Sequence, residues 1–194
     1  MSVVSICHTH MEDNMNQKIL VAVDLQNDFI TGTLGSEEAR KIIPHVVDKI
    51  KNWDGYIFVT RDTHDEKYLD TREGKYLPVK HCIENSPGHC INPDVKEALL
   101  KYNKNCCFLN KHTFGSTALP ELIDNLIGET NIECIELIGL CTDVCVVSNA
   151  MLLKAKFPNL DIIVDASCCA GVTPESHKAA LTTMKMCQID IIGE

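Results

Sequence analysis

The stretch IECIELIGLCTDVCVV, residues 132–147, decides the fold class of this 194-residue chain. It opens with a nearly continuous apolar run at 132–140, which is typical of a strand buried on both faces of a sheet. A turn containing Thr142 and Asp143 follows, and either residue is suited to cap the amino terminus of a helix. The stretch therefore predicts a strand, a tight turn and a helix in direct succession.

The same alternation continues along the whole chain. Short runs rich in Ile and Val predict six strands, at 18–25, 55–62, 105–110, 132–140, 160–166 and 189–192. Amphipathic segments between them predict helices at 36–53, 93–102, 119–127, 143–157 and 174–185. Alternating strands and helices are typical of α/β proteins. We therefore predict a three-layer α-β-α fold, in which helices cover a parallel sheet on both sides.

Length and composition fit one domain. The chain is 45% hydrophobic and 23% charged, as is ordinary for a globular protein. Its net charge of -9 argues against binding to nucleic acid phosphates, and no apolar run approaches the roughly 20 residues that span a bilayer. We predict a single domain over residues 18–194, preceded by a disordered leader at 1–17, with neither nucleic acid nor membrane as a partner.

The eleven cysteines do not read as a disulfide framework. Many lie in or beside apolar runs, where cysteine behaves as a small buried hydrophobe, and their number is odd. The amino terminus also lacks the basic start and apolar stretch of a signal peptide. We therefore predict mostly free thiols and a cytoplasmic location.

Residues with a use in catalysis follow four of the predicted strands. Asp24 ends the first, Asp62 the second and Lys111 the third, and the CTDVC segment at 141–145 follows the fourth. Because ligands of open α/β sheets bind outside the carboxyl ends of the strands, we expect these groups to converge. The mostly polar segment 63–94 adds a long loop, of the kind that is usually functional in compact domains.

Cys141 and Cys145 could form a metal pair, a redox pair, or one nucleophile beside a bystander. Zinc and redox pairs usually have C-x-x-C spacing, which is absent here. Cys145 falls in the first turn of the predicted helix, where unpaired N–H groups and the macrodipole stabilise a thiolate, and a nearby lysine would lower the thiol pKa further. Cys141 lies in the turn, where its backbone is expected to matter more than its sulfur. Two buried, inert cysteines are the alternative.

Four motifs resemble those of the isochorismatase-like cysteine hydrolases, within them the nicotinamidase/pyrazinamidase branch. They are DLQNDF (24–29), LPVKHC (77–82), NKHTFGS (110–116) and GLCTDVCV (139–146). The resemblance extends from about residue 18 to the carboxyl terminus. It implies a Rossmann-like fold with a six-stranded parallel sheet between helices.

The resemblance also implies a catalytic triad of Asp24, Lys111 and Cys145. The Cys145 thiolate would attack an amide carbonyl, and Asp24 would protonate the departing ammonia and then activate water. Lys111 would keep the thiol ionised. The backbone N–H groups of Cys141 and Cys145 would form the oxyanion hole, next to a cis peptide between Leu140 and Cys141.

Asp62, His64 and His81 are candidate metal ligands. Asp62 and His64 are two positions apart, so both can face one side of an extended segment, and His81 comes from the far end of the polar loop. Such ligands suit Zn²⁺, Mn²⁺ or Fe²⁺. The resemblance implies one divalent ion, with Glu73 as fourth ligand or, as second choice, Asp70. A hydrogen-bonded loop without an ion is the alternative.

The substrate implied by the resemblance is a small amide, with nicotinamide as the first choice. Phe29 and Phe114 would supply aromatic walls. Nicotinamidases often carry further aromatic residues at the places of the LPVK segment (77–80) and of Ala118. We therefore predict weaker binding of nicotinamide, with a higher Michaelis constant. The alternatives are an amidohydrolase for a ureido or N-carbamoyl acid and a non-catalytic small-molecule-binding scaffold. Family members often assemble, so a homo-oligomer is also an expectation.

Overall fold

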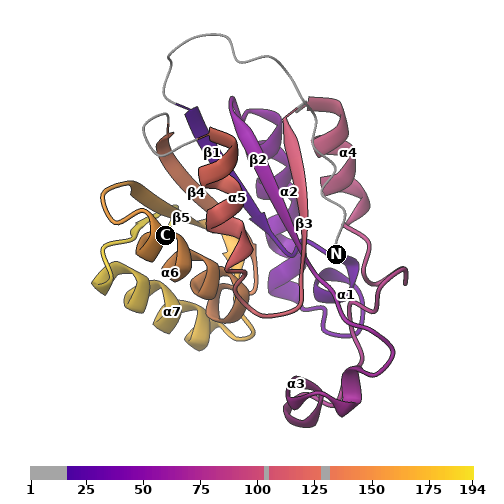
Figure 1. Ribbon diagram of the computed structural model, residues 1–194. Helices are drawn as coiled ribbons and strands as arrows, with labels where there is room; N and C mark the ends of the chain where they lie inside the picture. Colours follow the sequence, from indigo (N-terminus) through magenta and orange to yellow (C-terminus); the bar gives the residue numbers. More distant parts are fainter. Residues whose placement is uncertain (1–16, 103–104, 128–131) are drawn as a thin grey trace.

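The computed structural model describes residues 17–102, 105–127 and 132–194. Six strands form one parallel sheet in the order β3-β2-β1-β4-β5-β6 (Figure 1). They are β1 Gln17–Val23, β2 Tyr56–Asp62, β3 Cys106–Lys111, β4 Ile132–Leu140, β5 Asp161–Ala170 and β6 Asp190–Ile192. The strand order reverses between β1 and β4, so the carboxyl ends of these two strands form the switch point at which such sheets bind ligands.

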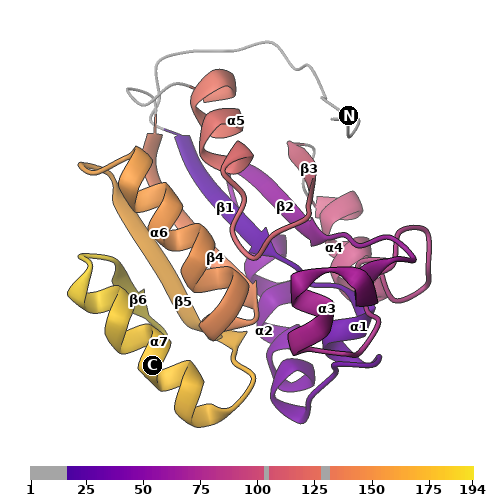
Figure 2. The ribbon, with the colours of Figure 1, turned by 60° about the horizontal axis from the view of Figure 1, so that its bottom comes forward.

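Helices cover both faces of the sheet, which confirms the predicted three-layer fold (Figures 1 and 2). On one face lie α1 Asn27–Ile30, α2 Glu37–Lys51 and α4 Pro93–Tyr102, and on the other α5 Ala118–Ile127, α6 Val147–Lys156 and α7 Pro174–Met186. Alternate side chains of β1 enter the two cores: Val21 packs with α5, α6 and α7, whereas Leu20 packs with α1, α2 and α4. Within the described residues, no helix has the length and apolarity to span a membrane.

Helix α2 illustrates how the sequence forms these elements. The Ser36 hydroxyl caps the helix by accepting a hydrogen bond from the N–H of Ala39 at 3.0 Å. Apolar residues recur at helical spacing and are buried against the sheet, at positions 39, 42, 43, 46 and 50. Each large apolar side chain buried in this way contributes roughly 1.5–3 kcal/mol, so a single face holds α2 in place.

The structure differs from the sequence-based prediction in several elements. β1 begins at Gln17, which was assigned to the leader; the rest of that leader lies outside the described residues. β5 continues to Ala170, four residues beyond the predicted end. α1 was not predicted, and the polar loop 63–94 contains a 3-10 turn, Tyr68–Asp70, and the short helix α3, Arg72–Tyr76. These helices are short, so they show too few turns for a periodic pattern.

The turn after β4 also differs from the prediction. It forms a wide π-helical turn over Thr142–Val146, and α6 begins only at Val147. Neither predicted cap residue caps it. The Thr142 hydroxyl hydrogen-bonds with His177 Nδ1 at 2.8 Å, and the Asp143 carboxylate accepts from the N–H of Val172 at 3.1 Å. Both side chains instead tie this turn to the segment around α7.

Candidate active site

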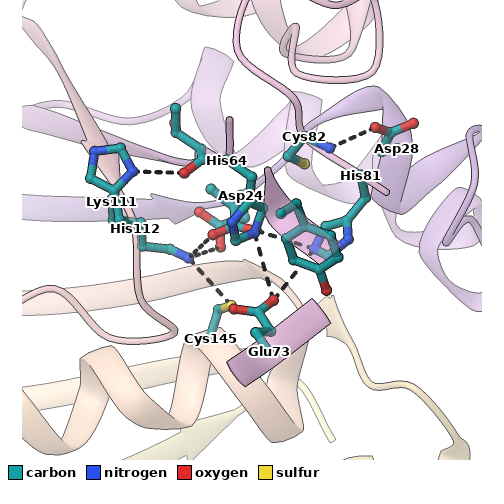
Figure 3. A network of polar contacts seen from close by, with 12 residues as sticks. Asp24, Asp28, His64, Glu73, His81, Cys82, Lys111, His112 and Cys145 are labelled. Atoms are coloured by element: carbon teal, nitrogen blue, oxygen red, sulfur yellow. Dashed lines mark hydrogen bonds and ion pairs between the residues drawn. The ribbon is translucent and has the colours of Figure 1, made fainter. Parts of the chain in front are cut away.

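Asp24, Lys111 and Cys145 lie together at the switch point, as Figure 3 shows. Asp24 directly follows β1, Lys111 is the last residue of β3, and Cys145 lies in the wide turn after β4. Lys111 Nζ is 2.6 Å from Asp24 Oδ2 and donates to Cys145 Sγ at 3.4 Å. All three residues are buried. The structure therefore brings together the three residues of the predicted triad.

Burial controls the protonation of these groups. It raises the pKa of Asp24, although the Lys111 charge opposes the shift. Burial would lower the pKa of Lys111, but the neighbouring acids, Asp24 first, raise it above its ordinary value. Burial and then the Asp24 charge raise the pKa of the Cys145 thiol, and they outweigh Lys111. The expectation of a lowered thiol pKa is thus wrong for this state, and a base must take the thiol proton before attack.

Thr60, in β2, holds the Asp24 carboxylate in place. Its hydroxyl donates to Asp24 Oδ1 at 2.7 Å, while the backbone N–H of Asp24 donates to the Thr60 carbonyl at 3.2 Å. Lys111 contacts the other carboxylate oxygen, so both oxygens of Asp24 are held. Sequence analysis missed Thr60 because a threonine within an apolar strand has no distinguishing pattern.

The turn that carries Cys145 is closed by Cys141. The peptide between Leu140 and Cys141 is cis, as the resemblance implied. The Cys141 carbonyl accepts hydrogen bonds from the N–H groups of Val144 at 3.1 Å and Val146 at 3.0 Å. Burial raises the pKa of the Cys141 thiol to about 12. The oxyanion role of the two backbone N–H groups stays a prediction.

Asp62, His64, Glu73 and His81 form a cluster whose ligand atoms all lie within 4.8 Å of one another. The Nε2 atoms of His64 and His81 are 2.9 and 3.4 Å from Asp62 Oδ2, and each is 3.6 Å from Glu73 Oε1. Asp70 is exposed and lies outside this cluster. Two imidazoles and two carboxylates suit a divalent transition-metal ion such as Zn²⁺.

Two contacts orient the cluster. His81 Nδ1 donates to the Val79 carbonyl at 2.9 Å, which leaves Nε2 facing the other ligands. Burial would raise the pKa of Asp62, but hydrogen bonds from His64 and His81 and the charge of Lys111 hold it well below its usual range. Asp62 Oδ1 also accepts from Lys111 Nζ at 3.2 Å. One carboxylate therefore joins the metal-ligand cluster to the triad.

Glu73 reaches the cluster because α3 turns back on the preceding 3-10 turn. The Thr71 hydroxyl caps α3 by accepting from the N–H of Gly74 at 3.0 Å. A Cβ at Gly74 would lie 2.1 Å from the Tyr68 carbonyl oxygen, so this approach requires glycine. The buried Tyr68 ring packs against His64 and His81, with ring centroids 4.6 and 4.9 Å away. Sequence analysis assigned Tyr68 no role.

The motif DLQNDF does more than supply Asp24. Gln26 is fully buried, donates to the Asp62 carbonyl at 2.8 Å and accepts from the Asp62 N–H at 2.7 Å. The Asp28 carboxylate accepts from the N–H of Cys82 at 2.8 Å, next to His81 (Figure 3). These two side chains thus hold both ends of the cluster, and their place within the motif was the only sequence signal.

A cavity of about 210 Å³ opens beside Cys145. Phe29 and Phe114 both line it, as predicted, and Phe114 is 46% exposed. The other walls are largely aliphatic and include Leu34, Leu77, Val144 and Val172. A larger and more open cavity of 480 Å³ lies beside Lys49 and Trp53, but none of the site residues lines it. The smaller cavity is therefore the candidate substrate pocket.

The isochorismatase domain pattern matches residues 18–193, nearly the whole described chain. The chain belongs to the isochorismatase family. This isochorismatase-family chain is 26% identical over 175 residues to the isochorismatase family protein PncA of Bacillus subtilis, covering 86% of this chain and 93% of that protein.

Solved structures of relatives share the fold of this family member. The crystal structure of the nicotinamidase PncA from Bacillus subtilis superposes with a TM-score of 0.75 at 28% identity, covering 91% of this chain and 99% of that chain. The pyrazinamidase of Pyrococcus horikoshii, solved in complex with zinc, superposes with a TM-score of 0.76 at 24% identity, covering 92% and 99%. Together with the site geometry, the family and its nicotinamidase relatives support amide hydrolysis by this chain.

Proposed function

We propose that this isochorismatase-family chain hydrolyses nicotinamide to nicotinate and ammonia through a thioester on Cys145. The observation that carries the proposal is the position of Lys111 Nζ, 2.6 Å from Asp24 Oδ2 and 3.4 Å from the Sγ of Cys145, which lines a small pocket. A nucleophile, an acid-base group and a fixed positive charge are the parts that acyl transfer from an amide requires.

The first half of the reaction forms the thioester. Asp24, whose pKa is raised by burial, accepts the proton of the Cys145 thiol, and the thiolate attacks the amide carbonyl. The backbone N–H groups of Cys141 and Cys145 hold the developing oxyanion, a contribution of roughly 2.7–4 kcal/mol per donor. Asp24 then protonates the leaving nitrogen, the C–N bond breaks, and ammonia departs.

The second half releases the acid. Asp24, again a carboxylate, accepts a proton from a water molecule, and the hydroxide attacks the thioester carbonyl. The C–S bond breaks, and Asp24 returns the proton to the departing sulfur of Cys145, which restores both groups. Lys111 stays charged throughout, because neighbouring acids raise its pKa. It therefore offsets the negative charge that moves between Asp24 and Cys145.

Asp62, His64, Glu73 and His81 are the residues that would hold one divalent ion, with zinc as our first choice. Such an ion, when bound, supplies a Lewis-acidic charge beside the pocket. The protein's own contribution is to aim four ligand atoms at one point and to keep Asp62 ionised through hydrogen bonds from both histidines.

The lining of the pocket favours an uncharged aromatic amide. Phe29 and Phe114 offer aromatic faces, while the charged lining residues are Asp62, Glu73 and His81. Among the residues described, no lysine or arginine lines the pocket to pair with a substrate carboxylate. A ureido or N-carbamoyl acid would therefore lack a partner for its carboxylate. The aliphatic walls give fewer stacking faces than an aromatic cage would, so we expect a higher Michaelis constant for nicotinamide.

Ammonia release from a panel of amides tests the proposal. The panel holds nicotinamide, pyrazinamide, an aliphatic amide and an N-carbamoyl amino acid, with Cys145→Ala as the control. Cys145-dependent hydrolysis of nicotinamide supports the proposal. Fast ammonia release from the N-carbamoyl acid, with no hydrolysis of nicotinamide, would instead identify an amidohydrolase for ureido or N-carbamoyl acids. No release from any amide would favour a non-catalytic binding scaffold.

Two further expectations accompany this function. Hydrolysis of a freely diffusing small amide is consistent with a cytoplasmic location, which fractionation of cells would check. Assembly into a homo-oligomer is the second expectation, and light scattering of the purified protein would give the mass of the particle. A mass equal to that of one chain would contradict it.

A further inference from the structure

Asn149, the third residue of α6, joins two parts of the site through one side-chain amide. Asn149 is fully buried. Nδ2 donates to the carbonyl of Cys145 at 2.8 Å and to the carbonyl of Phe114 at 3.3 Å, and Oδ1 accepts from the N–H of Ser116 at 2.9 Å. The same amide thus bonds to the turn that carries the nucleophile and to the loop that carries a pocket wall.

The loop 112–116 is seated closely on α6. A Cβ at Gly115 would lie 2.8 Å from Leu152 Cδ1 and 3.0 Å from Ser148 Cβ, so a larger residue here would require the Leu152 side chain to shift. At the start of the loop, His112 Nδ1 donates to the Thr63 carbonyl at 2.7 Å. The start of the loop is therefore tied to the segment after β2, and its end is tied to α6 by Asn149.

The side chain of Phe114 is an apolar ring, which makes no hydrogen bond of its own. It is 46% exposed and lines the pocket beside Cys145. Its place relative to the sulfur therefore depends on its backbone, which Asn149 holds on the carboxyl side of Phe114, at the Phe114 carbonyl and at the N–H of Ser116. A shift of this backbone would move the aromatic wall with respect to the nucleophile.

We propose that Asn149 is a positioning residue, which fixes the Phe114 wall relative to Cys145 and thereby sets the affinity for the substrate. The inference rests on the proposed function only for the substrate used to measure that affinity. Asn149→Leu keeps a similar volume but removes the amide, which leaves the Ser116 N–H and two carbonyls without this partner. Its KM for nicotinamide should rise roughly 2- to 10-fold, as for the loss of one stacking partner, with a smaller change in kcat.

A double-mutant cycle separates this role from a general loss of stability. If Asn149 acts through Phe114, then Asn149→Leu should add little to KM in a Phe114→Ala background. Phe29→Ala is the matched control, because Phe29 lines the same pocket from α1 and makes no hydrogen bond with Asn149 in this structure. In that background the two increases in KM should multiply. Multiplication in both backgrounds would overturn the proposal.

A second measurement does not depend on the substrate. Hydrogen exchange at the Ser116 amide should be faster in Asn149→Leu than in the parent, and an unchanged rate would overturn the proposal. If Asn149→Leu fails to fold, Asn149→Asp keeps the size and the acceptor for Ser116 but loses donors, and it should show the same rise in KM. If exchange at the Ser116 amide is faster in Asn149→Leu but the parent protein does not hydrolyse nicotinamide, the proposed function is refuted and the positioning role stands. The KM values would then be measured with the amide that the panel identifies.

Discussion

At the scale of single residues, one ammonium group contacts three acids. Lys111 Nζ lies within 3.4 Å of Asp24, Asp62 and Cys145. Fully buried charges are tolerated only when they are paired, and each of these groups is paired through this lysine. The same side chain therefore contacts both the candidate nucleophile and the metal-ligand cluster.

The two cysteines of the wide turn should differ sharply in their contribution. Cys145→Ala should lower kcat/KM for the amide substrate by roughly 10³-fold or more, because it removes the nucleophile. Cys141→Ala should retain most activity, since the proposed role of Cys141 involves its backbone N–H and not its sulfur. Steady-state ammonia release measures both. Equal losses in the two variants would contradict the assignment of the nucleophile.

Thr60 should act on the rate through Asp24. Thr60→Val keeps the shape but removes the hydroxyl that donates to Asp24 Oδ1. A hydrogen bond to a charged group contributes about 1.5–3 kcal/mol, so kcat should fall roughly 10- to 100-fold with little change in KM. Thr60→Ser restores the hydroxyl and should recover most of the rate. A valine variant with normal kcat would show that Asp24 needs no second support.

At the scale of elements, α2 is tied to the sheet by a charge as well as by its apolar face. Lys49 Nζ lies 2.6 Å from Glu136 on β4 and 2.8 Å from Asp165 on β5. The two carboxylates are over 90% buried, whereas the lysine side chain is 23% exposed. Burial would raise the pKa of Asp165, but hydrogen bonds from Lys49 and Ser167, together with the Lys49 charge, lower it.

Lys49→Met should therefore destabilise the fold in a pH-dependent way. It leaves two buried carboxylates uncompensated, which should cost about 1–3 kcal/mol after discounting for the partial exposure of Lys49. Because the pKa of Asp165 is lowered on folding, its stabilisation is present above the ordinary aspartate pKa and is lost as the pH falls below it. Urea denaturation at several pH values should show a gap between parent and variant that narrows in acid.

The surface pair of Lys41 and Glu37 provides the control for this measurement. The side chains of Lys41 and Glu37 are 65% and 69% exposed. Lys41→Met should change the free energy of unfolding little at any pH, because exposed pairs are screened by water. A constant gap for Lys49→Met across the pH range would contradict the part assigned to Asp165.

The strands and long helices were predictable because their patterns are local. The runs at 18–25 and 132–140 became β1 and β4 within two residues, since a strand buried on both faces must be apolar throughout. The wide turn over Thr142–Val146 was not predictable in the same way. Its polar side chains bond to His177 and Val172, which are about thirty residues further along the chain. Only the folded structure brings those partners near.

The same distinction applies to the site. Asp24, Lys111 and Cys145 follow strands, so the topology alone brings them together. Thr60 and Asn149 were missed, because their importance lies in single hydrogen bonds to distant backbone or carboxylate atoms. Such bonds depend on three-dimensional position and leave no periodic trace in the sequence.

At the scale of the whole molecule, the metal-ligand cluster joins the carboxyl end of β2 to the polar loop 63–94, so its four ligands meet only when this part of the chain is folded. Bound metal should therefore stabilise the entire fold: at about 100 times its dissociation constant, an ion adds roughly 2.7 kcal/mol. Chelation should lower the melting temperature of the purified protein, and added zinc should restore it. Calorimetry with and without chelator gives the size of the shift.

His64→Ala and His81→Ala should remove this response, since loss of one ligand of four removes most of the affinity. His45→Ala, an exposed residue on α2, is the control and should respond as the parent does. Metal analysis should find close to one ion per chain in the parent and in the control. An unaltered thermal response in both cluster variants would show that any bound ion lies elsewhere.

The strand order also has a consequence for the protein during its synthesis. β1 is made first but occupies the middle of the sheet, between β2 and β4. A ribosome must add more than a hundred residues after β1 before β4, at Ile132–Leu140, exists to pair with it. Until then one edge of an apolar strand stays open, and open strand edges are templates for aggregation. The nascent chain should therefore be most prone to aggregate, and most dependent on chaperones, until β4 has been made.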